Sequence, residues 1–183
     1  TLKYDLNDAM LRPSFKLENV IDGVFALATS LYGLQFTDNK DIPVYHPEVS
    51  TYEVLDSEGN HLSVFYTDFF PRATKRQGAW MTNFVNQRNI CGENVRPMVV
   101  NVCNFTAPQG DTPALLNIDE TRTLFHEFGH ALHGMLTQTH YPSVSGTNVK
   151  HDFVELFSQV NEKWAVHPEV MPTFAKHYKT GEP

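Results

Sequence analysis

The sequence predicts an α+β fold in which a small sheet is followed by helices. Two stretches rich in Tyr, Val, Leu, Phe and Thr, residues 49–56 and 61–69, lie on either side of the polar turn 56–60 and predict a β-hairpin. From residue 118 the apolar residues recur at helical spacing to the end of the chain, apart from a loop at 141–149. Strands that precede helices in 183 residues without a visible linker predict one α+β domain.

A helix is expected before the sheet, over residues 17–32, and Gly33 follows it where a left-handed cap costs little. Its apolar positions are Leu17, Val20, Ile21, Val24, Leu27, Ala28 and Leu31. A connector with prolines at 43 and 47 leads to the hairpin. Residues 96–102 predict a further strand, apolar enough to be central, and a loop with Pro108, Gly110 and Pro113 precedes the later helices.

Charge and hydropathy exclude several classes of partner. The 14 basic and 21 acidic residues leave a net charge of −7, which disfavours binding to nucleic acid. No apolar run approaches the roughly 18 residues that a membrane span needs. The first residues, Thr1 to Asp5, contain neither a Met start nor a signal segment, so we expect residues 1–183 to be part of a longer chain.

Two cysteines, Cys91 and Cys103, are too few for a disulfide framework and too far apart in sequence for a CxxC metal pair. They are interpreted as reduced thiols, which fits a cytoplasmic location without excluding the periplasm.

The motif H-E-x-x-H spans residues 126–130 within the helix expected from residue 118. Because an α-helix turns about 100° per residue, His126 and His130 lie about 40° apart on one face and can hold one metal ion. Glu127 lies beside that position, where it could deprotonate a water. Asn117 and Glu120 resemble a capping box at the start of this helix. The apolar residues fall on the opposite arc, so we favour a metal site over a pair of solvated surface histidines.

A catalytic zinc site needs a third protein ligand and an open position. The extended motif with a third His is rejected, because Leu132 and Leu136 occupy its Gly and His positions. Glu155, on a second amphipathic helix that begins near residue 151, is the better candidate, and it shares a face with Gln159 and Glu162. The alternative is that Asp152 and Glu155 form a capping box.

Around this centre, we expect His133 and Gln159 to support the ligands or to line the cleft, without binding the ion directly.

Several motifs together resemble the thimet oligopeptidase family of zinc peptidases, within it the peptidyl-dipeptidases. The central motifs are residues 123–134, 145–148 and 152–155, and the supporting ones are 43–47, 78–81, 101–104 and 161–168. The resemblance implies a helix-rich, gluzincin-type peptidase with a small sheet beside the active-site helix. It implies one zinc ion held by His126, His130 and Glu155, with Glu127 as the catalytic residue.

The resemblance also implies oligopeptide substrates and, in this subgroup, release of C-terminal dipeptides. Related enzymes pair an edge strand with the substrate backbone, and Gly78 and Ala79, before Trp80, are the candidates here. Packing of Trp80 in the sheet is the alternative explanation of that segment.

The chain departs from the family at Phe157, where Pro is usual, and at Gln77, where Gly is usual. Family members are several times longer, and they supply oxyanion-stabilising side chains from a later segment. Tyr141 and Tyr178 are not at the matching place, so we expect this chain to bind zinc but to hydrolyse peptides weakly.

Three alternatives stay open. One is an oligopeptidase of the same family that cleaves internal bonds. Another is a non-catalytic zinc module with His133, His140 or His151 as a fourth ligand. The third is a truncated product that self-associates through apolar surface.

Overall fold

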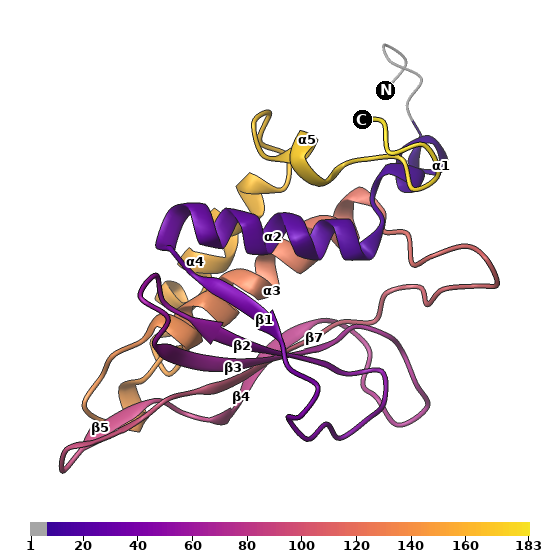
Figure 1. Ribbon diagram of the computed structural model, residues 1–183. Coiled ribbons are helices and arrows are strands. Elements are labelled where there is room, and N and C mark those ends of the chain that lie inside the picture. The colour runs from indigo at the N-terminus through magenta and orange to yellow at the C-terminus, as the bar shows by residue number, and fades with distance from the viewer. Residues whose placement is uncertain (1–6) are drawn as a thin grey trace.

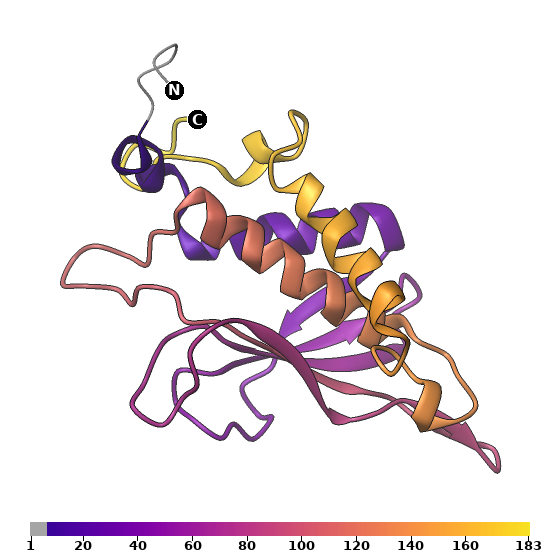
Figure 2. The same cartoon turned by 180° about the vertical axis from the view of Figure 1, so that it is seen from behind.

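Long helices cover one face of a twisted sheet in the computed structural model, which describes residues 7–183 (Figure 1). Helix α3 lies between the sheet and α4, and α4 is the outer helix when the molecule is seen from behind (Figure 2). The expectation about residues 1–5 falls outside the described part of the chain. The elements are α1 (Asp8–Leu11), η1 (Arg12–Ser14), α2 (Leu17–Tyr32), β1 (Gln35–Asp38), β2 (Ser50–Leu55), β3 (His61–Asp68), β4 (Trp80–Val85), β5 (Arg88–Ile90), β6 (Glu93–Val95), β7 (Met98–Val102), α3 (Ile118–Leu136), η2 (Pro142–Val144), α4 (His151–Trp164) and α5 (Met171–Phe174).

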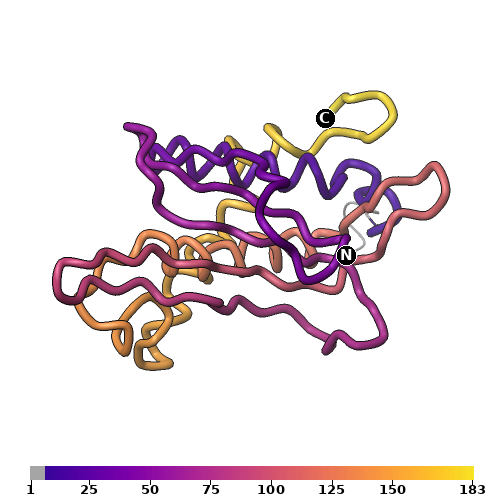
Figure 3. The backbone as a smooth tube through the Cα atoms, turned by 60° about the horizontal axis from the view of Figure 1, so that its bottom comes forward, coloured from indigo at the N-terminus to yellow at the C-terminus, as the bar shows by residue number. Residues whose placement is uncertain are grey.

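The sheet has the strand order β1-β2-β3-β7-β4, so β7 is internal and β4 is an edge strand. Strands β3 and β7 are parallel, whereas the other neighbours in this sheet are antiparallel. The short hairpin β5–β6 is separate from the sheet and protrudes at one end of the molecule, opposite the loop that follows β7 (Figure 3). The molecule is therefore a mixed fold with a small sheet and several helices.

Most predicted elements are confirmed. Helix α2 has the predicted bounds, and Gly33 caps it with a φ of 70°. The hairpin β2–β3 and the internal strand β7 lie where the alternation places them. The residue pattern did not predict the edge strands β1 and β4, of which β1 shows little burial. For β4, the resemblance had pointed only to an edge strand at Gly78 and Ala79, directly before its first residue, Trp80.

The prediction of helix to the chain end, apart from the loop at 141–149, is wrong at 137–140, at 165–170 between α4 and α5, and after α5. Residues 175–183 form no helix, and the segment instead returns to the beginning of the described chain, where Tyr178 N donates a hydrogen bond to Pro13 O over 2.9 Å. Gly181, with a φ of 73°, and Pro183 disfavour a helix there.

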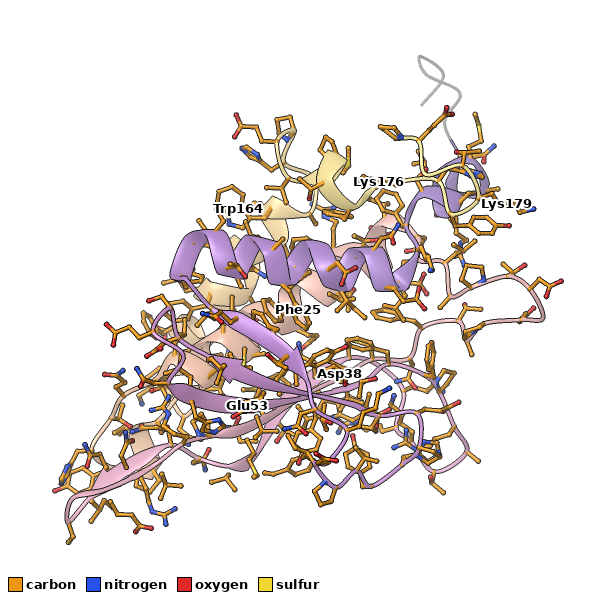
Figure 4. The ribbon with its side chains drawn as sticks, in the orientation of Figure 1. Phe25, Asp38, Glu53, Trp164, Lys176 and Lys179 are labelled. Carbon is orange, nitrogen blue, oxygen red and sulfur yellow. The ribbon has the colours of Figure 1, made fainter. Side chains whose placement is uncertain are left out.

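An aromatic cluster joins α2, the sheet and α3. The ring of Phe128, inside the H-E-x-x-H motif, lies 5.7 Å from that of Phe65 and 5.9 Å from that of Phe25. Phe25 stands between α2 and the sheet (Figure 4) and stacks on Phe36 at 4.1 Å. Because this cluster fixes one face of α3 against the sheet, the opposite face of the motif is free for chemistry.

A buried ionic cluster lies where β3 ends. The carboxylate of Asp68, 2% exposed, accepts hydrogen bonds from Arg72, Lys75 and Tyr45 over 2.8–2.9 Å. Burial alone would raise the pKa of Asp68, but these hydrogen bonds outweigh it and lower the pKa from 3.8 to about 2.

This cluster predicts how stability depends on pH. The lowered pKa of Asp68 corresponds to about 2 kcal/mol, which is present above the unfolded-state pKa and is lost as the pH falls from about 5 to about 2. In urea unfolding, the chain with Asp68→Asn should lose correspondingly less stability than wild type over that range. Identical pH dependence of the two chains would contradict this assignment.

Candidate metal centre and active site

Two histidines of α3 and one glutamate of α4 converge on one point. The capping box of Asn117 and Glu120 fixes the start of α3, and both of its hydrogen bonds are present, at 2.7 and 2.8 Å. Two turns further on, the Nε2 atoms of His126 and His130 lie 3.3 and 3.2 Å from the same Oε2 atom of Glu155. The predicted face of the motif therefore meets the predicted carboxylate.

The spacing of these atoms suits a zinc ion. Two ligand atoms about 2.0–2.1 Å from a tetrahedral zinc lie about 3.3–3.4 Å from each other. The Nε2–Oε2 distances of 3.3 and 3.2 Å are close to that separation. Imidazole nitrogen and carboxylate oxygen are ligands that zinc accepts. Within residues 7–183, no other group of three His, Cys, Asp or Glu side chains has such an arrangement.

Glu155 does not cap its helix. The N-cap of α4 is Lys150, which makes no side-chain capping hydrogen bond. The carboxylate of Glu155 instead accepts a hydrogen bond from Ser158 Oγ over 2.7 Å. Burial opposes the ionisation of Glu155, but this hydrogen bond and the two histidines lower its pKa. The side chain is thus kept anionic and turned towards α3.

A glycine of the motif allows α4 to approach α3 closely enough for this contact. A Cβ atom on Gly129 would lie 2.7 Å from Phe157 O and 2.7 Å from Ser158 Cα. Nearby, the buried Asn161 Nδ2 donates a hydrogen bond to Phe125 O over 2.6 Å. Neither contact was predicted, because each depends on how the two helices dock and not on local pattern.

Gly129→Ala is expected to weaken zinc binding by about tenfold or more, since the new methyl group displaces the backbone that carries Glu155. Zinc affinity is measured by chelator competition. Gly23→Ala is the matched control, because its Cβ would meet Phe174 Cβ at 2.7 Å on the far side of the core. An equal loss of zinc affinity in both variants would show that general destabilisation is the cause.

Glu162 contacts His126 on the side of the imidazole ring away from the metal position. Its Oε1 atom lies 2.6 Å from His126 Nδ1, so a proton held on Nδ1 leaves the lone pair of Nε2 directed at the metal position. The expected supporting residue Gln159 is exposed and lies in an apolar groove with Leu156 and Val160. The periodicity explains this correction, because residue 162 is only about 20° from residue 155 around the helix and residue 159 about 40°.

His133 lies in the cleft between α3 and α4. Its ring is 4.2 Å from that of Phe157 and 6.3 Å from that of Phe153. Burial, together with the nearby His130, lowers the pKa of His133. It is not among the side chains that converge on the metal position.

Glu127 is the buried carboxylate beside this centre. It is 6% exposed, and its Oε2 atom has no hydrogen-bond partner among residues 7–183. Burial raises the pKa of Glu127 to about 7, a rise that His126 opposes and Glu155 reinforces. A carboxylate with this pKa can accept and return a proton near neutral pH.

A cavity of about 310 Å³ connects these side chains to the edge strand. Ala79 and Trp80 line it together with Glu127. Gly78 has a φ of 100°, and its carbonyl accepts a hydrogen bond from Asn104 Nδ2 over 2.7 Å. Tyr141 does not line this cavity, and Tyr178 lies near Pro13 instead.

Comparison with known proteins agrees with this arrangement. The model of peptidase family M3 matches residues 1–183. The chain is 48% identical over 180 residues to dipeptidyl carboxypeptidase of Escherichia coli, covering 98% of this chain and 26% of that protein. It is 41% identical over 182 residues to oligopeptidase A of the same organism, covering 98% and 27%.

More distant similarity extends beyond bacteria. The chain is 37% identical over 180 residues to a thimet-like oligopeptidase of Dictyostelium discoideum, covering 96% of this chain and 27% of that protein. The chain thus spans about a quarter of the length of the curated relatives that it matches. The resemblance stated from the motifs is confirmed: the chain belongs to peptidase family M3.

Proposed function

We propose that the protein is a zinc-dependent peptidase that hydrolyses oligopeptides and releases C-terminal dipeptides. The convergence of His126, His130 and Glu155 beside the buried carboxylate of Glu127 carries this proposal. In the proposal, residues 1–183 form part of a gluzincin-type catalytic domain whose oxyanion-stabilising side chains lie elsewhere in a longer chain. The similarity to proteins four times as long supports this part of it.

The proposed roles follow from the contacts of each side chain. Bound zinc supplies a Lewis acid that acidifies a water and polarises the scissile carbonyl. Glu127 takes the proton of that water and later gives it to the departing amine, which its raised pKa favours. Glu162 holds His126, and Ser158 holds Glu155, so that the three ligand atoms keep their positions.

The edge strand β4 gives the substrate backbone a place to pair. Its inner side pairs with β7, and its other side has no strand neighbour in the described part of the chain. Ala79 lines the cavity directly before this strand, and Gly78 precedes it without a side chain. We therefore propose that Gly78 and Ala79 contact the backbone of an extended peptide.

Product analysis tests the mode of cleavage. The identities of 48% and 49% to dipeptidyl carboxypeptidases, against 41% to oligopeptidase A, favour dipeptide release over internal cleavage. An N-acetylated octapeptide incubated with the longest natural chain that contains this sequence, loaded with zinc, should lose dipeptides one after another from its C-terminus. Mass spectrometry follows the products. A mixture of internal fragments would favour the endopeptidase alternative, and an intact peptide would contradict peptidase activity.

A non-catalytic zinc module is the alternative from another class. Structural zinc sites are usually closed by four protein ligands. The group formed by residues 7–183 has three, and His133, His140 and His151 are not members of it. Metal analysis together with exchange by small chelators distinguishes an open site from a closed one.

The proposal also includes a cytoplasmic location and partners other than nucleic acid. Cys91 and Cys103 are both free, which fits a cytoplasmic location. None of the described helices combines the length and hydropathy that a bilayer span needs. The net charge of −7 speaks against nucleic acid as a partner.

Exposed Leu156 and Val160 on α4 support self-association of the isolated chain, which size-exclusion chromatography tests.

A further inference from the structure

Arg122 of α3 lines a cavity, and the proposed chemistry gives this residue no role. A second cavity, of about 420 Å³, lies beside the metal centre and is lined by Asp119, Arg122, Thr123, His126, Glu127 and Glu162. His126 and Glu127 line this cavity as well as the one beside β4. The catalytic carboxylate therefore stands between two spaces, one beside the edge strand and one beside Arg122.

Arg122 is a cation without a partner in the described chain. Its Nε atom is buried and has no hydrogen-bond partner within residues 7–183. No ion pair of those residues includes it. Of the acidic residues in the same cavity, Glu162 is bound to His126 and Asp119 is exposed to solvent. The half-buried guanidinium lines the cavity without an acidic partner among the described residues, so a ligand that brings a carboxylate into the cavity would bind it favourably.

The distance from Arg122 to His126 along α3 is close to the length of two residues of an extended peptide. Arg122 precedes His126 by four residues, which is about 6 Å along the helix axis and places both on one face. Two residues of an extended peptide span about 7 Å. A peptide cleaved beside Glu127, with two residues beyond the scissile bond, would thus bring its C-terminal carboxylate close to Arg122.

We infer that Arg122 binds the C-terminal carboxylate of the substrate and so sets the length of the released product at two residues. This inference rests on the proposed peptidase function and deepens it. Guanidinium and carboxylate match in geometry and can form two parallel hydrogen bonds. Among the described residues that line the two cavities, Arg122 alone carries a permanent positive charge, whereas Asp119, Glu127, Glu155 and Glu162 are acidic.

The test compares two peptides that differ only at their C-terminal group. An N-acetylated tetrapeptide and the same peptide with a C-terminal carboxamide are hydrolysed by the longest natural chain that contains this sequence, loaded with zinc. One charged hydrogen-bonded contact corresponds to about a 10- to 100-fold preference in kcat/KM for the acid over the amide. In Arg122→Gln this ratio should fall towards one, and Arg122→Lys should keep part of it.

Arg88→Gln is the charge-matched control, because Arg88 lies in the separate hairpin and pairs there with Glu93. It should keep the preference for the acid. An Arg122→Gln protein that keeps the preference overturns the inference, and so does one that loses activity equally on both peptides.

Failure of the inference is separable from failure of the proposed function. If the wild-type protein cleaves the peptide acid and the peptide amide equally well, it is a peptidase in which Arg122 does not bind the C-terminal carboxylate. A wild-type protein that binds zinc but cleaves neither peptide contradicts the proposed function instead. Calorimetric binding of a dipeptide and of its amide then tests Arg122 without turnover: the acid should bind about 10- to 100-fold more tightly, and equal affinity overturns the inference.

Discussion

Glu127→Gln is expected to reduce kcat by about 10²- to 10⁴-fold while zinc binding stays near the wild-type level. The amide has the shape of the carboxylate but cannot take a proton from water. The site makes this loss specific, because Glu127 is buried, its Oε2 atom has no partner within residues 7–183, and its pKa is raised to about 7. The measurement is kcat for an N-acetylated peptide, on the longest natural chain that contains this sequence, together with the zinc content of the same sample.

Two results separate this role from a structural one. A Glu127→Gln protein with full zinc content, a native circular dichroism spectrum and almost no turnover has lost the proton acceptor alone. Turnover at the wild-type rate would remove Glu127 from the mechanism, and loss of zinc would make it part of the metal site.

Glu155→Gln should weaken zinc binding by more than the roughly 10- to 100-fold loss that is typical when an outer hydrogen-bond partner of a ligand is removed. The variant replaces an anionic ligand atom, the Oε2 that lies within 3.3 Å of both histidine Nε2 atoms, by a neutral amide. Glu162→Gln removes only the partner of His126 Nδ1, so its loss should fall within the 10- to 100-fold range. Both affinities are obtained by chelator competition on the metal-free protein.

Gln159→Ala on the same helix is the control for this pair, because Gln159 is exposed and lies in the apolar groove away from the metal position. Its zinc affinity should equal that of wild type. If Gln159→Ala and Glu162→Gln lost affinity equally, the assignment of Glu162 as the partner of His126 would be wrong.

The sequence predicts those features that depend on local pattern. The spacing of apolar residues gives the bounds of α2, and strand alternation gives the β2–β3 hairpin. The histidine spacing within one helix brings His126 and His130 to one face, because helical geometry is the same wherever the helix lies. The meeting of these histidines with Glu155 rests on two helices, and it was expected because a third ligand had to come from a neighbouring element.

Features that arise from docking could not be predicted in this way. The approach of α4 to Gly129 and the hydrogen bond of Asn161 to Phe125 O join distant residues. The edge strand β4 has no alternation of apolar and polar residues, because its apolar residues stand in adjacent pairs, Trp80 with Met81 and Phe84 with Val85. Glu162 was within reach of the sequence, since its offset of two turns from Glu155 matches the period of the helix more closely than that of Gln159.

The strand order has a consequence for how the cavity opens. Strand β4 precedes β7 in the chain but lies outside it, so it is held by hydrogen bonds to β7 alone, while β7 is bonded on both sides. Local opening of β4 breaks one ladder and leaves the rest of the sheet intact, and it therefore costs less free energy than opening β7. The cavity beside Glu127 is therefore bounded on one side by a strand that opens more easily than its neighbour β7, and amide protons of β4 should exchange with deuterium sooner than those of β7.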